Sequence, residues 1–262
     1  MKPHQFVAVM GLAGVLIPSQ VFAYARPNTF EDKKGATRIQ ELKRFQAQNN
    51  LVVTGSIGPE TKRHLEDTKR QVYDLVEHPP TKGYWIAINK SRKTLTLYRG
   101  GVSQGKYPVA LGTSATPTPS GKTKIINKHV NPAWGGMGGT PRSADDPKNP
   151  LGERWMGLGL RGSKGGYGIH GTILPGQIGT YASNGCIRMF NYDIEELLFP
   201  LVKVGTPVWI GTNDELASWG VRQIIEEAAP APAPTTPQPQ ETPEAPAPQA
   251  DTREAVDILE FE

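Results

Sequence analysis

The chain contains one cysteine, Cys186, and a histidine, His170, sixteen residues before it. A thiol attacks a carbonyl as its thiolate, and a nearby imidazole can accept the proton. Gly185 before the sulfur and Arg188 two residues after it indicate a turn beside a cation rather than an apolar run. A single cysteine is more commonly a small buried hydrophobe. Its combination with His170 instead predicts a cysteine nucleophile and its base.

His170 is the best base candidate among the five histidines. Alternating glycines around it, Gly168 and Gly171, let the backbone approach closely and present the imidazole in a cleft. The other histidines lack a companion motif: His4, His64, His78 and His129. We expect the Cys186–His170 pair to titrate as a coupled unit, with the thiolate favoured at lower pH than in a free thiol.

Acyl transfer also needs donors for the oxyanion of a tetrahedral intermediate. Gly185 lets the backbone turn so that its own amide and that of Cys186 converge, and these two amides are the predicted donors. Ser183 either hydrogen-bonds within this turn or contacts His170. The interpretations differ only in whether Ser183 touches the base.

Arg188 offers a bidentate cation for a substrate carboxylate. The alternative is an ion pair with Asp193 or Glu195. One cysteine and scattered histidines give no ligand pairs at short spacing, so we predict neither a metal nor a cofactor. Residues 157–162 match G-x-G-x-x-G, but no strand of a βαβ unit clearly precedes them, which argues against a dinucleotide site.

Residues 82–211 must position these side chains. Short β-type runs separated by Gly and Pro predict a mainly β fold, a mostly antiparallel sandwich or closed sheet. The predicted strands are residues 85–88, 94–98, 107–111, 124–126 and 207–210. The segment 193–201 is the one good helix candidate in this part of the chain.

The segment 35–77 predicts a small α-helical module, two helices around a turn. Pro59 opens the second helix, which would carry Leu65, Val72, Tyr73 and Val76. His-Pro-Pro at 78–80 would then form a linker to the β-rich part.

The two ends of the chain differ from its centre. Residues 1–25 contain an apolar run of twelve before small residues at cleavage spacing, which predicts a signal peptide, an uncleaved anchor being the alternative. Residues 226–251 are rich in Pro and Ala and predict a disordered spacer. Residues 252–262 mix acids with apolar residues and form either a frayed tail or a docking segment.

Charge is unevenly distributed. The formal net charge is +4, but residues 213–262 hold eleven acids against two arginines, so residues 1–212 carry +13. A basic body suits an acidic polymer. Because export is predicted, an anionic cell-wall polymer in the periplasm or cell wall is favoured over nucleic acid as the partner.

Ile-His-Gly-Thr at 169–172 and Ser-Asn-Gly-Cys-Ile-Arg-Met at 183–189 resemble the signature of the L,D-transpeptidase catalytic domain family. Thr-Pro-Thr-Pro-Ser-Gly at 116–121 and Asn-Pro-Ala-Trp at 131–134 extend the resemblance, which covers about residues 82–211. Many members carry His directly before the Gly of this signature, where this chain has Asn184. The segment 35–77 also resembles a peptidoglycan-binding domain, through Thr-Gly at 54–55 and Ile-Gly-Pro at 57–59.

The resemblance implies a β-sandwich catalytic domain and acyl transfer on peptidoglycan stem peptides, which serve as donor and acceptor. Cys186 would attack the carbonyl of the L-centre of a diamino acid and expel the terminal D-Ala. His170 would be the base, oriented by the carbonyl of Gly171. Aminolysis would form 3-3 cross-links or attach a protein to the wall. The alternatives are an L,D-carboxypeptidase and a non-catalytic wall-binding protein.

Overall fold

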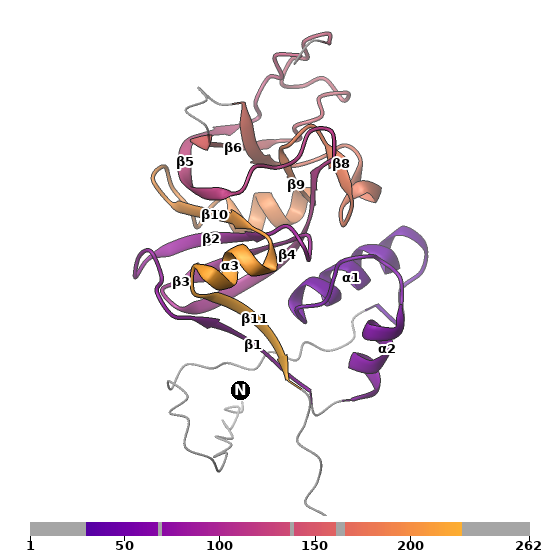
Figure 1. The fold of residues 1–262 in the computed structure, drawn as a ribbon. Helices are drawn as coiled ribbons and strands as arrows, with labels where there is room; N and C mark the ends of the chain where they lie inside the picture. Colours follow the sequence, from indigo (N-terminus) through magenta and orange to yellow (C-terminus); the bar gives the residue numbers. More distant parts are fainter. Residues whose placement is uncertain (1–29, 68–69, 137–138, 161–165, 227–262) are drawn as a thin grey trace, which may run out of the picture. The chain divides into compact units, whose positions relative to one another are not determined.

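The computed structural model describes residues 30–67, 70–136, 139–160 and 166–226 (Figure 1). The predicted signal peptide and the C-terminal segments lie outside these residues, except Glu226. Within the described part of the chain, no helix combines the length and apolarity needed to cross a bilayer.

A nine-stranded sheet forms the centre of the described residues. Its strands are β2 (Tyr84–Asn89), β3 (Thr94–Arg99), β4 (Val102–Gly112), β5 (Gly121–Val130), β6 (Arg154–Leu158), β7 (Tyr167–His170), β8 (Tyr181–Ser183), β9 (Ile187–Met189) and β10 (Pro207–Gly211). Their order is β3-β2-β10-β5-β6-β7-β9-β4-β8, and β3 also pairs with β4. This extra pairing closes the sheet on itself. The mainly β prediction is confirmed, and the closed form is the one adopted.

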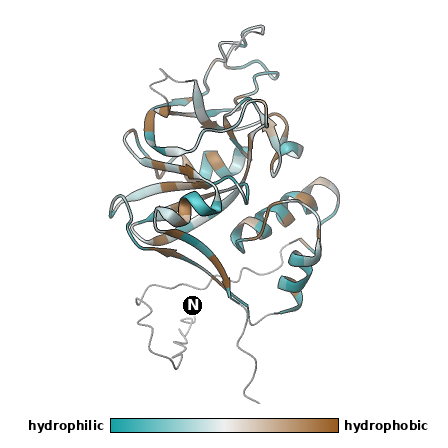
Figure 2. Ribbon diagram, viewed as in Figure 1, coloured by the Kyte–Doolittle hydropathy of each residue, from teal (hydrophilic) through white to brown (hydrophobic). Residues whose placement is uncertain are grey.

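Alternation along the strands builds two hydrophobic clusters on opposite faces of β2. Figure 2 shows apolar positions, in brown, along the strands. In β2, Ile86 and Ile88 face the main core, while Trp85 and Ala87 face a second cluster on the opposite side. That second cluster is covered by Leu216 and by Val221. Both faces of β2 are therefore buried, which is why its sequence is a continuous apolar run.

The second cluster is covered by two elements beyond the predicted catalytic segment. They are α3 (Asn213–Ser218) and β11 (Val221–Glu226). Thr212 caps α3 with a reciprocal capping box, since its hydroxyl accepts from Glu215 N and the Glu215 carboxylate accepts from Thr212 N. The chain past residue 211 thus completes the sheet's outer layer.

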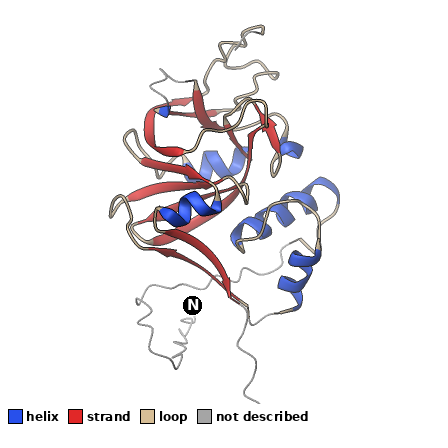
Figure 3. Ribbon diagram, viewed as in Figure 1, coloured by secondary structure: helices blue, strands red, loops and turns tan. Residues whose placement is uncertain are grey.

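The two helices predicted at the start form as α1 (Gly35–Gln48) and α2 (Pro59–Glu66), with Pro59 in the first turn of α2. The predicted continuation of α2 through Val72, Tyr73 and Val76 is wrong. Residues Gln71–Val76 form strand β1, which pairs antiparallel with β11 (Figure 3). A short apolar run does not distinguish helix from strand, and the partner strand lies 150 residues away.

The predicted helix at 193–201 is shorter and wider than expected. It is the π-helix η3 (Asp193–Leu198), which buries Ile194 and Leu198 against the main core. Its first residue, Asp193, is 1% exposed. Burial raises the pKa of Asp193, and the neighbouring Arg44 guanidinium opposes that shift.

Helix α1 lies against β4 (Figure 1) and contributes the cation that neutralises Asp193. Arg44 of α1 donates from Nη2 and Nε to Asp193 Oδ1 at 2.9 and 3.1 Å. Arg44 also pairs with Glu41 and lies over the Phe190 ring. The buried Asp193 carboxylate is stable as a charged group only while the Arg44 guanidinium remains beside it.

Arg44→Met should therefore lower the free energy of unfolding by about 3–5 kcal/mol, because it leaves the Asp193 carboxylate buried and unpaired. Urea denaturation of the full chain measures this. The control is Arg63→Met, which removes an exposed ion pair with Glu60 and should change stability by less than about 1 kcal/mol. Equal effects of the two substitutions would contradict this account of the Arg44–Asp193 pair.

Candidate active site

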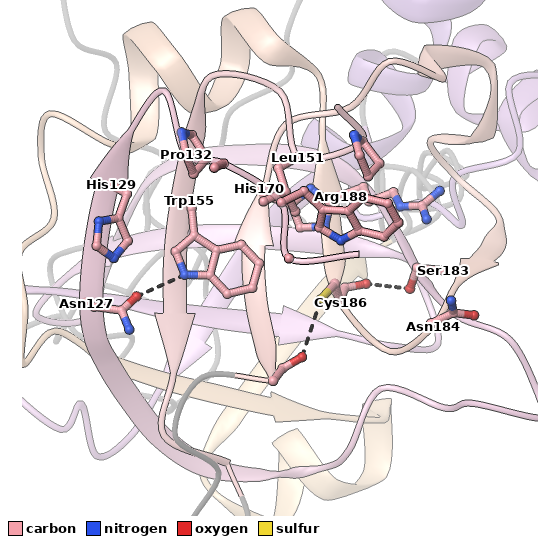
Figure 4. A pocket seen from close by; sticks show the side chains of 15 residues that line it. Asn127, His129, Pro132, Leu151, Trp155, His170, Ser183, Asn184, Cys186 and Arg188 are labelled. Carbon is pink, nitrogen blue, oxygen red and sulfur yellow. Dashed lines mark hydrogen bonds between the residues drawn. The ribbon is translucent and has the colours of Figure 1, made fainter. Parts of the chain in front are cut away.

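The predicted site residues are brought together by a parallel pairing of two short strands. In the β7–β9 ladder, Ile169 lies opposite Ile187 and His170 opposite Arg188. Side chains two residues apart in a strand share a face, so Cys186, directly before β9, falls on the same side as Arg188. His170, Cys186 and Arg188 all line one cavity of about 510 Å³ (Figure 4).

The cavity wall contains the upstream segment that supported the family resemblance. Pro132, Ala133 and Trp134 line it, as does Leu151. His129, which the sequence offered no role, is exposed and also lines this cavity. The segment 131–134 is thus part of the site.

Gly185 makes the turn before the sulfur. Its φ of +108° is unfavourable for other residues, and an added Cβ would lie 2.7 Å from the Tyr167 ring. Ser183 Oγ donates to Cys186 O at 2.6 Å and accepts from Gly185 N at 3.1 Å. Ser183 therefore holds the turn, which is one of its two predicted roles. The Gly185 amide is engaged with Ser183 in this conformation, and the Cys186 amide remains the oxyanion candidate.

His170 is held in one tautomer. Its Nδ1 lies 2.7 Å from the carbonyl oxygen of Gly171, which can only accept a hydrogen bond. Nδ1 therefore carries the proton, and Nε2 is left to accept one. This is the contact that the family resemblance implied for Gly171.

Trp155 and Asn127 shape the surroundings of His170, and neither was predicted from the sequence. The Trp155 ring stacks on the His170 ring with centroids 5.8 Å apart, and Trp155 Nε1 donates to Asn127 Oδ1 at 2.9 Å. A Cβ at Gly168 would lie 2.5 Å from the Trp155 ring, so glycine is needed there. Trp155 faces His170 only because β6 pairs with β7, and no linear motif signals that pairing.

The pKa shifts contradict the expected low-pH thiolate. Burial, helped by the positive charge of Arg188, lowers the pKa of His170 to about 4, although hydrogen bonds to the backbone of Gly171 and Leu151 oppose it. Burial raises the pKa of Cys186, against a backbone hydrogen bond from Gly168 and the charge of Arg188. Desolvation disfavours both charged forms. Both shifts favour a neutral thiol and a neutral imidazole at rest, and Cys186 Sγ lies 3.9 Å from the carbonyl oxygen of Gly166.

Arg188 reaches the cavity without an acidic partner. Its Nη1 donates to Gln177 Oε1 at 2.7 Å, and its Nε is buried with no hydrogen-bond partner. Asp193 is paired with Arg44 instead. No carboxylate in the described ranges forms an ion pair with Arg188, so its guanidinium keeps a full charge facing the cavity.

Alkylation should report this neutral resting state. We expect the rate of Cys186 modification by iodoacetamide to rise with a midpoint above about pH 8.5, the value of an exposed cysteine, because burial disfavours the thiolate. The measurement is a rate–pH profile by mass spectrometry. A short cysteine peptide is the control, and His170→Ala should leave the midpoint nearly unchanged. A plateau already reached below pH 7, lost in His170→Ala, would instead show a preformed ion pair.

Sequence similarity to known proteins identifies the family of this chain. Residues 83–210 match the family model of the L,D-transpeptidase catalytic domain, YkuD. A Bacillus subtilis protein that bears the name L,D-transpeptidase YkuD is 42% identical over 182 residues, which are 70% of this chain and 98% of that protein. The Escherichia coli K12 protein YbiS, also named as an L,D-transpeptidase, is 30% identical over 229 residues, 78% of this chain and 73% of its own.

Among solved structures, the catalytic domain of an Enterococcus faecium L,D-transpeptidase shares 24% identity. The match covers 50% of this chain and 99% of that domain, with a TM-score of 0.41. The sequence relatives carry the assignment, because the B. subtilis protein is matched over nearly its whole length. This chain belongs to the L,D-transpeptidase family.

Proposed function

We propose that this protein is exported and acts on peptidoglycan stem peptides as an L,D-transpeptidase with Cys186 as nucleophile and His170 as base. The observation that carries the proposal is that Cys186, His170 and Arg188 line one cavity from two paired strands. Family membership supports the substrate class, and the signal peptide predicted at residues 1–25 supports a location in the periplasm or cell wall.

The first half-reaction forms a thioester. Cys186 Sγ bonds to the carbonyl carbon of the L-centre of the donor's diamino acid, and the thiol proton passes to His170 Nε2. Both groups start neutral, so charge develops only as the sulfur attacks. The tetrahedral intermediate collapses by breaking its bond to the amine of the terminal D-Ala, which leaves with the proton from His170.

The second half-reaction determines the product. An amine of a second stem peptide attacks the thioester, loses a proton to His170 and forms a 3-3 cross-link, while the Cys186 thiolate leaves and regains that proton. An amine of a wall-anchored protein would give attachment to the wall by the same route. Water would give an L,D-carboxypeptidase. A non-catalytic wall-binding role is disfavoured, because it requires no aligned cysteine, histidine and arginine.

Two features support stabilisation of charge at this site. The Cys186 amide lies beside the attacking sulfur, in a turn fixed by Ser183 and by Thr118, whose hydroxyl donates to Gly185 O at 3.0 Å. The Arg188 side chain lines the cavity, and its guanidinium donates to the neutral amide of Gln177. A carboxylate of the stem peptide fits this unsatisfied cation.

Cys186→Ala should abolish release of D-Ala from a purified tetrapeptide, a loss of at least about 10⁴-fold, because the attacking sulfur is removed and the Ser183 hydroxyl in the same turn is bound to Cys186 O and Gly185 N. Mass spectrometry of the muropeptide products measures it and also separates cross-linked, hydrolysed and unreacted species. Tyr192→Ala is the control, since this side chain is exposed and does not line the cavity. Retained turnover in a correctly folded Cys186→Ala protein would refute the nucleophile assignment.

Arg188→Ala should raise KM for the tetrapeptide roughly 10- to 100-fold with a smaller change in kcat, the scale expected for losing a hydrogen-bonded ion pair to substrate. Steady-state kinetics of D-Ala release give the two parameters separately. A thermal melt of the same variant tests the structural alternative. Unchanged KM together with a large fall in stability would assign Arg188 to folding instead.

A further inference from the structure

Gln177 is the residue that fixes Arg188 in the cavity. It ends the 3₁₀ helix η2 (Pro175–Gln177), in the connection between β7 and β8. Its Oε1 accepts the 2.7 Å hydrogen bond from Arg188 Nη1. Because the amide is neutral, it orients the guanidinium without cancelling its charge. The direction of Arg188 therefore depends on where η2 is held.

Helix α1 holds η2 through a buried lysine. Lys43 is 5% exposed, and its Nζ donates to the carbonyl oxygen of Gly176 at 3.0 Å. No carboxylate in the part of the chain that the structure describes pairs with Lys43. A buried ammonium without a counter-ion costs free energy, and burial lowers the pKa of Lys43. The Lys43 ammonium is therefore bound to Gly176, the residue directly before Gln177.

The turn after α1 is built around this lysine. Gly55 has a φ of +74°, and a Cβ there would lie 2.7 Å from Lys43 Cε. Gln46 fixes the same turn, since its Oε1 accepts from the amides of Thr54 and Gly55 at 2.8 Å each. Thr-Gly at 54–55 is part of the resemblance to a peptidoglycan-binding domain. In this fold it packs against the aliphatic part of Lys43, whose Nζ reaches the connection between β7 and β8.

A second contact holds the far end of that connection. Val53 lies so close to Gly179 that a Cβ on Gly179 would be 2.8 Å from Val53 Cγ1. Gly179 N in turn donates to Val109 O of β4 at 3.0 Å. The connection is therefore held on both sides of Gln177: by Lys43 of α1 at Gly176, and by Val53, in the segment after α1, at Gly179.

We propose that Lys43 and Gln177 are positioning residues for Arg188, so that helix α1 helps to set the affinity of the active site for its anionic substrate. This inference rests on the proposed function, in which Arg188 binds a stem-peptide carboxylate. Without these contacts the guanidinium is free to rotate, and substrate binding must then order it. The penalty falls on binding rather than on the chemical step.

The test is steady-state kinetics with the tetrapeptide for Lys43→Met and Gln177→Leu in the full chain. KM should rise roughly 3- to 10-fold, the scale of ordering one long side chain, with kcat within about twofold. Gln177→Glu should raise KM further, because its carboxylate would neutralise Arg188. Lys62→Met is the matched control, an exposed lysine of α2 that pairs with Glu66 at 3.7 Å, and should change neither parameter.

A double-mutant cycle separates positioning from general stability. In an Arg188→Ala background, Lys43→Met should raise KM no further, since it acts through Arg188. A full additional rise there, or an unchanged KM in both single variants, overturns the inference. Gln177→Leu, at a half-buried loop position, carries the test if Lys43→Met does not fold.

Binding measured without turnover keeps the two proposals apart. Calorimetry with the tetrapeptide in the Cys186→Ala background should show the same weakening of Kd by Lys43→Met. If that weakening is seen but the wild type releases no D-Ala, the inference stands and the proposed reaction fails. If the Cys186→Ala protein does not bind the tetrapeptide, the inference is overturned.

Discussion

The parallel pairing of β7 with β9 is the constraint on which the site depends. It is only two residue pairs long, yet Ile169 and Ile187 are both fully buried in the main core. Burial of each such side chain contributes about 1.5–3 kcal/mol, so the register is firmly set. A slip by one residue would turn His170 to the opposite face, away from Cys186 and Arg188.

Burial at this register sets the chemistry of the site. His170 and Cys186 are 3% and 8% exposed, and this burial favours the neutral form of each by lowering the pKa of His170 and raising the pKa of Cys186. The Trp155 ring over His170 adds to this desolvation. A neutral thiol resists indiscriminate oxidation and alkylation. In the proposed reaction, the substrate would supply the electrophile that draws the thiol proton to His170 Nε2. The same packing that builds the core thus makes reactivity conditional on substrate.

Two cations on α1 connect the N-terminal helices to the part of the fold that holds the site. Arg44 neutralises the buried Asp193, and Lys43 reaches the connection that holds Arg188. Both cations leave the aqueous phase, which is favourable only because each has a fixed acceptor on the β-rich part. The resemblance of residues 35–77 to a wall-binding module therefore coexists with a direct role of α1 in supporting the catalytic sheet.

The mainly β class and its short strands could be predicted from the alternating and continuous apolar runs of the sequence. The pair Cys186 and His170 could be predicted too, because a lone thiol beside glycine with a histidine nearby is a chemical pattern visible in one dimension. That Gln71–Val76 is a strand could not be predicted from local sequence, since its partner β11 is distant in the chain. Likewise, Trp155, Gln177 and Lys43 meet the site through pairing and packing between distant segments. The neutral resting state also depended on burial, which no local sequence pattern encodes.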